Sequence, residues 1–167
     1  ALPGSLEAIA RLTKAGYKVV VATNQSGLGR GYFDIMTLNA IHQKMQAAVK
    51  AAGGMIEAIF FCPHTASDNC DCRKPRQGMF SSISERYETK LDEVPSVGDS
   101  LRDLQAAFLA GCTPILVLSG KGKQTLENGG LPPKTDIFDN LAAVAEHLLT
   151  REVKTVEARD KTSQETS

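Results

Sequence analysis

Four residues of types that commonly bind zinc crowd into one short stretch of this chain: Cys62, His64, Cys70 and Cys72. Thiolate and imidazole donors suit Zn²⁺, which takes four nitrogen or sulfur ligands in a tetrahedron. Because four protein ligands leave no open position for a catalytic water, we predict a structural zinc loop. Its expected role is to hold the next two residues, Arg73 and Lys74, at a fixed place. A loop of reduced cysteines with an incidental histidine is the alternative.

Three polar segments could together bind a phosphate ester and Mg²⁺. At the end of a predicted strand, the hydroxyl of Thr23 and the backbone N–H of Asn24 could hold phosphoryl oxygens. Arg73 and Lys74 could clamp the phosphate, and the Asp99 carboxylate could bind Mg²⁺. Each segment also has a purely structural interpretation: a hydrogen-bonded turn, two surface charges and a helix N-cap, respectively.

The elements that must position these residues alternate between strand and helix. Apolar and β-branched runs predict strands at 17–22, 56–61, 94–97, 114–118 and 136–138. Helical periodicity predicts helices before and between these strands and over 140–149, and residues 119–135 are predicted to be a connector. This alternation indicates a doubly wound parallel α/β sheet, in which ligands bind outside the carboxyl ends of the strands. All three polar segments fall at that edge.

Composition restricts the kind of protein. The chain has 167 residues, 42% of them hydrophobic, with 19 basic and 19 acidic side chains. These values predict one globular domain over 1–150 with no net charge to attract nucleic acid or a membrane. The charged residues 151–167 are predicted to be a helical extension or a disordered tail. Clustered cysteines indicate a reducing compartment, so we expect a cytoplasmic protein, and we expect a monomer.

In their order along the chain, these motifs resemble those of the haloacid-dehalogenase-like (HAD) phosphatases. Within that superfamily the sequence looks like the D-glycero-D-manno-heptose-1,7-bisphosphate 7-phosphatases, and the related histidinol-phosphate phosphatases share the zinc loop. The resemblance extends over residues 1–149. The segments that carry it are Val21–Gly27, Arg30-Gly31, Cys62–Pro75 and Val97–Ala107.

The resemblance implies a HAD-like (Rossmannoid) fold and a Mg²⁺-dependent phosphatase of the lipopolysaccharide precursor pathway, acting on the 7-phosphate of a heptose bisphosphate. Thr23 and Lys74 would be catalytic, the first binding the transferring phosphoryl group and the second neutralising its charge. Asp99 would bind Mg²⁺, whereas Asp103 is interpreted as a first-turn helix charge. The substrate-binding residues that it implies are Thr23, Asn24, Gln25, Ser26, Arg30, Arg73, Lys74 and Ser100.

One motif of the family does not occur in this sequence. The family carries its nucleophile and its acid/base in an Asp-x-Asp-Gly motif, on a central strand between those corresponding here to 17–22 and 94–97. We therefore expect that strand to be absent, with a segment ahead of Ala1 as its source, and the chain as written to be inactive. Histidinol phosphate is the alternative substrate. A non-catalytic, zinc-stabilised domain that binds phosphorylated ligands is the alternative function.

Overall fold

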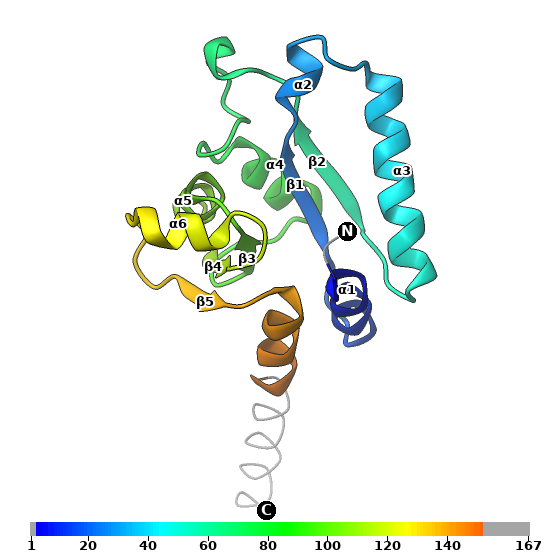
Figure 1. Cartoon of the computed structure of the whole chain (residues 1–167), viewed down its shortest axis with the longest axis vertical. Helices are drawn as coiled ribbons and strands as arrows, with labels where there is room; N and C mark the ends of the chain where they lie inside the picture. Colours follow the sequence, from blue (N-terminus) through cyan, green and yellow to red (C-terminus); the bar gives the residue numbers. More distant parts are fainter. Residues whose placement is uncertain (1–2, 152–167) are drawn as a thin grey trace, which may run out of the picture.

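The computed structural model describes residues 3–151, and strands alternate with helices throughout (Figure 1). Residues 141–151 form the last helix described. The strands are β1 (Val20–Asn24), β2 (Ala58–Cys62), β3 (Pro95–Gly98), β4 (Thr113–Val117) and β5 (Asp136–Phe138). The other helices are α1 (Ser5–Lys14), α2 (Ser26–Gly29), α3 (Ile35–Ala51), the 3₁₀ turn η1 (Ala66–Asp68), α4 (Gly78–Tyr87), α5 (Leu101–Leu109) and α6 (Gly122–Asn128).

All five strands pair in parallel, as the alternation predicted, and they form two sheets. β1 pairs with β2, with Asn24 opposite Cys62, and the second sheet has the order β3-β4-β5. Among residues 3–151, β1 and β3 therefore each have one edge without a strand partner. The additional strand expected between them stays a prediction.

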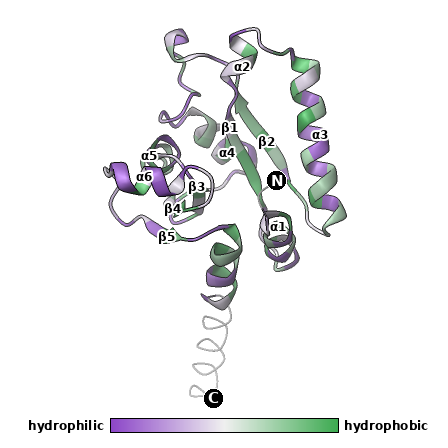
Figure 2. Cartoon of the chain, in the orientation of Figure 1, coloured by the Kyte–Doolittle hydropathy of each residue, from purple (hydrophilic) through white to green (hydrophobic). Residues whose placement is uncertain are grey.

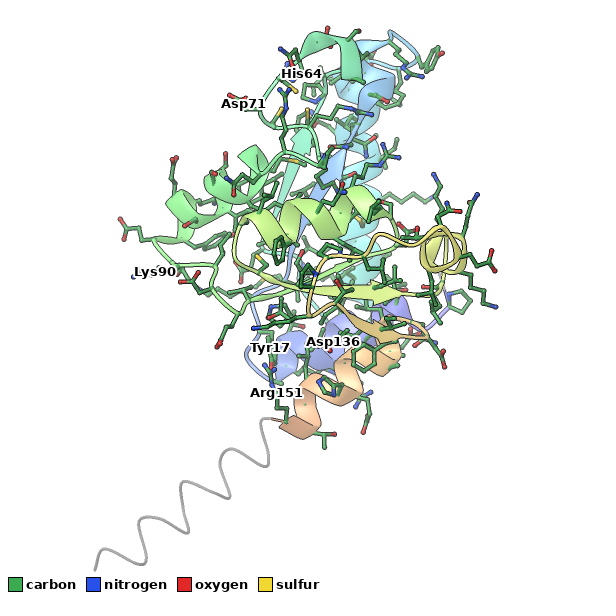
Figure 3. All side chains as sticks on the ribbon, turned by 90° about the vertical axis from the view of Figure 1, so that its left-hand side faces the viewer. Tyr17, His64, Asp71, Lys90, Asp136 and Arg151 are labelled. Atoms are coloured by element: carbon green, nitrogen blue, oxygen red, sulfur yellow. The ribbon has the colours of Figure 1, made fainter. Side chains whose placement is uncertain are left out.

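Helices cover both faces of the β3-β4-β5 sheet (Figures 1 and 3). α5 packs on β3 and β4 from one face, and α1 and the helix at 141–151 lie on the other. Burial of apolar side chains between these layers is the main driving force for the fold. The core on the α1 face consists of Ala8, Leu12, Ile115, Val117, Val144, Ala145 and Leu148.

The β1-β2 sheet is built from apolar residues, drawn mostly green in Figure 2. α4 packs on β2, and α3 contacts it where the His42 ring lies 5.7 Å from that of Phe61, measured between centroids. His42 thus packs against β2. All residues of β1 are nevertheless only half-buried, and Val97 in β3 is exposed. Both strands keep apolar surface in contact with water.

Three sequence predictions need correction. The first strand spans Val20–Asn24 instead of 17–22, so Thr23 and Asn24 belong to the strand and not to the loop after it. The expected connector at 119–135 contains α6, whose short apolar pattern is masked by glycines and lysines. The second strand spans Ala58–Cys62 instead of 56–61, so its last residue is the first predicted zinc ligand.

The predicted division at residue 150 stays a prediction, because most of 151–167 lies outside the described residues. Arg151 is exposed and helical. In the part that is described, no helix combines the length and the apolar character needed to cross a bilayer.

Candidate functional site

Asn24 holds the backbone of Lys74 through both ends of its side-chain amide. The Lys74 N–H donates to Asn24 Oδ1 at 3.0 Å, and Asn24 Nδ2 donates to the carbonyl oxygen of Lys74 at 3.2 Å. The two residues are 50 positions apart in the sequence. The Asn24 side chain thus fixes Lys74 to the end of β1, and phosphate binding by the backbone N–H of Asn24 stays a prediction.

The Lys74 side chain links β1 of the first sheet to α5, the helix that follows β3 of the second sheet. Its ammonium group donates to the carbonyl oxygen of Ala22 in β1 at 2.9 Å. It also forms an ion pair with Asp103 Oδ1 at 2.6 Å, in the first turn of α5. The two side chains are 11% and 20% exposed, so water screens the pair only in part. The structure therefore presents a positive charge where the sequence analysis expected a phosphate site.

Asp103 is the site residue that sequence reasoning missed. Its Oδ2 accepts hydrogen bonds from the hydroxyl of Ser100 at 2.7 Å and from the Ser100 N–H at 3.2 Å, which caps α5. Burial opposes ionisation of Asp103, but the charge of Lys74 and these hydrogen bonds outweigh it and lower the pKa of the carboxyl group. The prediction of a first-turn helix charge was correct but incomplete, since the same carboxylate also orients Lys74.

The other residues predicted to bind phosphate lie around the end of β1. Thr23 is the penultimate residue of the strand, and its hydroxyl accepts a hydrogen bond from Gln25 Nε2 at 3.2 Å. Ser26 begins α2. Arg30 follows α2 and is exposed, and among the described residues its side chain makes no hydrogen bond or ion pair. The geometry therefore joins Thr23 to Gln25 but does not join Arg30 to the site.

The four predicted zinc ligands come together at the end of β2, and their donor atoms all lie within 4.8 Å of one another. A tetrahedral zinc site has sulfur–sulfur edges of about 3.8 Å and nitrogen–sulfur edges of about 3.5 Å. Cys70 lies at 3.5 Å from Cys62 and 3.6 Å from Cys72, and His64 Nδ1 lies at 3.5 and 3.3 Å from the same two sulfurs. The Cys62–Cys72 edge is shorter, at 2.7 Å. The donor types and the other four edges fit a closed zinc site, whereas the Cys62–Cys72 edge is shorter than such a site requires.

Two cysteines of the cluster differ in the pKa of their thiols. Burial opposes ionisation of Cys70, but hydrogen bonds from the Arg73 backbone and from neighbouring ligands outweigh it and lower the thiol pKa to about 7. Burial and the adjacent sulfurs raise the pKa of Cys72 to about 12. A cation between the sulfurs would favour the thiolate form of both, because metal ligation deprotonates thiols.

Two arginines stabilise the zinc loop from outside. Arg76 donates to the carbonyl oxygen of Cys70 and to Asn69 Oδ1, both at 2.6 Å, and Arg73 donates to the carbonyl oxygen of His64 at 3.4 Å. Figure 3 shows His64 in this loop at one end of the molecule, far from Arg151. The guanidinium of Arg73 contacts the loop, and its predicted role in substrate binding stays a prediction. Arg76 was not predicted at all, since a lone arginine after Pro75 has no distinctive pattern.

Asp99 follows β3, close to Ser100 and hence to the Lys74–Asp103 pair. Its Oδ2 accepts a hydrogen bond from the Lys121 N–H at 3.0 Å, and its backbone carbonyl oxygen accepts one from the Thr125 hydroxyl at 2.7 Å. Mg²⁺ is commonly bound by one or two carboxylates together with substrate phosphates and water. The position of Asp99 fits that pattern.

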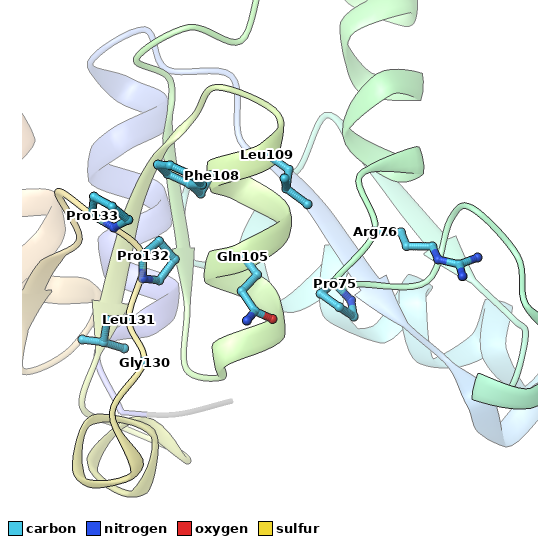
Figure 4. Close-up of a pocket in the computed structure, with 9 residues that line it drawn as sticks. All are labelled: Pro75, Arg76, Gln105, Phe108, Leu109, Gly130, Leu131, Pro132 and Pro133. Atoms are coloured by element: carbon cyan, nitrogen blue, oxygen red, sulfur yellow. The ribbon is translucent and has the colours of Figure 1, made fainter.

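A separate pocket of about 550 Å³ lies between α5 and residues 130–133, with Pro75 and Arg76 at one side and Gln105 in its wall (Figure 4). Its lining is mostly proline, leucine and phenylalanine side chains. No residue predicted to bind phosphate or metal lines it. We therefore locate the candidate site at the strand ends and not in this pocket.

Two protein-family models match the chain. One, described as HAD-hydrolase-like, matches residues 71–144, and the other, described as polynucleotide kinase 3 phosphatase, matches residues 3–106. Together they include the end of β1, the zinc loop and the segment after β3.

Known proteins with high sequence identity cover most of the chain. The D-glycero-β-D-manno-heptose-1,7-bisphosphate 7-phosphatase of Bordetella bronchiseptica is 61% identical over 149 residues, which cover 89% of this chain and 83% of that protein. The crystal structure of the D,D-heptose 1,7-bisphosphate phosphatase from B. bronchiseptica, complexed with magnesium and phosphate, matches with a TM-score of 0.89 and 60% identity, covering 90% of this chain and 84% of that one. The corresponding phosphatase from Burkholderia thailandensis matches with a TM-score of 0.74 and 55% identity, covering 89% and 86%.

Proposed function

This chain belongs to the HAD-type family of heptose-1,7-bisphosphate 7-phosphatases, and we propose that it contributes the phosphate- and metal-binding side of such an active site. The substrate that we propose is D-glycero-β-D-manno-heptose 1,7-bisphosphate, with loss of its 7-phosphate, because the similar proteins carry that name. Such a reaction would serve lipopolysaccharide precursor synthesis in the cytoplasm.

The observation that carries this proposal is the position of Lys74. Its ammonium group contacts Ala22 in β1 and Asp103 at the start of α5. The residue that follows Ala22 in the strand is Thr23, which carries the hydroxyl proposed to bind phosphate. Phosphoryl transfer depends mostly on positioning and on stabilising negative charge, and a lysine held by Asp103 and by the Asn24 amide is suited to both.

The nucleophile would come from a further strand between β1 and β3. Among the described residues, β1 and β3 each have an edge without a strand partner. Lys74 links β1 to the start of α5, the helix that follows β3. An Asp-x-Asp-Gly strand placed there would bring its carboxylates beside Thr23 and Lys74. Attack by one carboxylate on phosphorus would form an aspartyl-phosphate as the ester P–O bond breaks, and the leaving sugar oxygen would take a proton from the second carboxyl group of the motif. Water, deprotonated by that second carboxylate, would then hydrolyse the aspartyl-phosphate to inorganic phosphate and the free carboxylate.

Two metals complete the proposal. Asp99 would hold Mg²⁺, which neutralises phosphate charge, and support comes from the B. bronchiseptica structure, which contains magnesium and phosphate. Cys62, His64, Cys70 and Cys72 would hold Zn²⁺ as a structural ion, because these four nitrogen and sulfur donors are grouped within 4.8 Å of one another.

The test joins the full chain to an upstream strand that bears Asp-x-Asp-Gly and measures phosphate release from the heptose bisphosphate with Mg²⁺. We expect release, and we expect Lys74→Ala to lower kcat by about 10²–10³-fold, the effect of losing one charge-stabilising donor. The exposed Lys90 provides the matched control, and Lys90→Ala should leave kcat unchanged.

Two results would contradict the proposal. A change below about threefold on Lys74→Ala, far less than one lost donor costs, would remove Lys74 from the site. Binding of the heptose bisphosphate without phosphate release would favour the alternative of a non-catalytic domain that binds phosphorylated ligands. Preferential release from histidinol phosphate would keep the chemistry and change the substrate, although the similar proteins do not favour that alternative.

A further inference from the structure

The turn after β4 and the helix α6 that follows it each hold Asp99 at one point. The Thr125 hydroxyl donates to the Asp99 carbonyl oxygen at 2.7 Å, and the Lys121 N–H donates to Asp99 Oδ2 at 3.0 Å. Thr125 is buried, with 8% of its surface exposed, and it lies 26 residues from Asp99 in the sequence. Buried hydroxyl groups are usually hydrogen-bonded, and here the acceptor is the backbone carbonyl oxygen of Asp99, the proposed Mg²⁺ ligand.

Gly120 brings the same turn against the Asp99 carboxylate. Its φ is +61°, in the left-handed region that favours glycine. A Cβ on this residue would lie 2.4 Å from Asp99 Oδ2, well inside van der Waals contact. The position of the carboxylate therefore depends on the absence of a side chain at Gly120.

We propose that Thr125 and Gly120 are positioning residues that set the angle at which Asp99 presents its carboxylate to a divalent cation. This inference rests on the proposed function, in which Asp99 is the Mg²⁺ ligand. With Oδ2 engaged by the Lys121 N–H, Oδ1 is left for the cation. Groups that orient a metal-binding carboxylate typically contribute 10–100-fold in metal affinity.

The test measures binding of Mn²⁺, as a probe for Mg²⁺, to the full zinc-loaded chain by electron paramagnetic resonance. Asp99→Asn removes the proposed metal-binding carboxylate and gives the baseline for Mn²⁺ binding. Thr125→Val removes the hydroxyl but keeps the shape of the side chain, and we expect it to weaken Mn²⁺ binding by about tenfold or more. Thr125→Ser keeps the hydroxyl and should retain the parent affinity, whereas it would weaken binding if the packing of the Thr125 methyl group were what mattered.

Two matched controls separate positioning from general damage. The Thr135 hydroxyl donates to the Pro132 carbonyl oxygen at 2.7 Å, so Thr135→Val deletes a similar bond away from Asp99 and should leave Mn²⁺ binding unchanged. Gly120→Ala should weaken binding, whereas Gly129→Ala should not, because Gly129 also has a positive φ (+75°) but nothing within 4 Å of its Cβ position. The glycine pair keeps the test decisive if Thr125→Val does not fold.

Each outcome has one meaning. Parent binding that Asp99→Asn abolishes, and that Thr125→Val and Gly120→Ala weaken, supports the inference. Parent binding that Asp99→Asn abolishes but that Thr125→Val and Gly120→Ala leave intact overturns the inference and leaves the proposed function standing. Absence of Asp99-dependent binding in the parent overturns the assignment of Asp99, and the inference with it.

Discussion

At the scale of single residues, the Lys74–Asp103 pair is the point where stability and proposed function meet. Asp103 uses one carboxylate oxygen for the ammonium group and the other for Ser100, so both charges are satisfied in a partly buried place. Removing one partner leaves the other desolvated and unpaired, which costs more than the pair itself contributes.

We expect Asp103→Asn to lower the free energy of unfolding by about 1.5–3 kcal/mol at pH 7, the usual range for a hydrogen bond to a charged group. The pKa of Asp103 is lowered from 3.8 in the folded state, so its stabilising contribution is present above pH 3.8. That contribution disappears as the pH falls through the folded-state pKa. Urea unfolding of both proteins between pH 7 and pH 2.5 should therefore give a difference that is constant above pH 3.8 and begins to shrink only below it.

Asp71→Asn is the control, because Asp71 is fully exposed and its contact with Arg76 spans 3.9 Å. It should change stability little at any pH, as is usual for exposed ion pairs. A difference between parent and Asp103→Asn that stays constant down to pH 2.5 would contradict the role given to ionised Asp103.

At the scale of elements, the zinc loop joins the two segments that hold Lys74. Cys62 ends β2 and lies opposite Asn24 in the strand register, and the Gln25 N–H donates to its carbonyl oxygen at 2.8 Å. Cys72 lies two residues before Lys74. A metal bound by both Cys62 and Cys72 would therefore hold the Lys74 backbone at a fixed distance from the Asn24 side-chain amide.

We expect the purified chain to contain one zinc and to lose it on Cys72→Ser, with faster amide exchange over 62–76, because metal binding and folding of such loops are coupled. Metal analysis and hydrogen–deuterium exchange measure both effects. Cys112→Ala is the control, since Cys112 is buried among Phe80, Ala106 and Ala107, and it should keep the zinc. Less than half a zinc per parent chain, purified without chelator, would contradict a structural zinc site.

At the scale of the whole molecule, the two sheets are held together without strand pairing between β1 and β3 in the described residues. Packing of α1 and β4, together with the Lys74 bridge, connects the two sheets. Open parallel edges expose backbone N–H and C=O groups and are prone to pairing with other strands. We therefore expect weak protection of β1 and β3 along their open edges.

We expect amides of β1 and β3 to exchange faster than those of β4, whose Ile115 and Leu116 are buried and paired on both sides. Joining the Asp-x-Asp-Gly strand should slow exchange in β1 and β3 and leave β4 unchanged, because only the first two would gain a partner. Equal protection of all three strands in the chain alone would contradict open edges.

The sequence by itself determined the local chemistry and the fold class. Strand and helix periods predicted the parallel α/β arrangement, and residue type and spacing predicted the Cys62/His64/Cys70/Cys72 cluster, because such patterns depend on near neighbours along the chain. The tertiary structure decided the partners across distance: the Asn24 amide on the Lys74 backbone, Asp103 on the ammonium group, and Thr125 on Asp99. These contacts depend on strand register and on which loops meet at one sheet edge, and no local pattern records either.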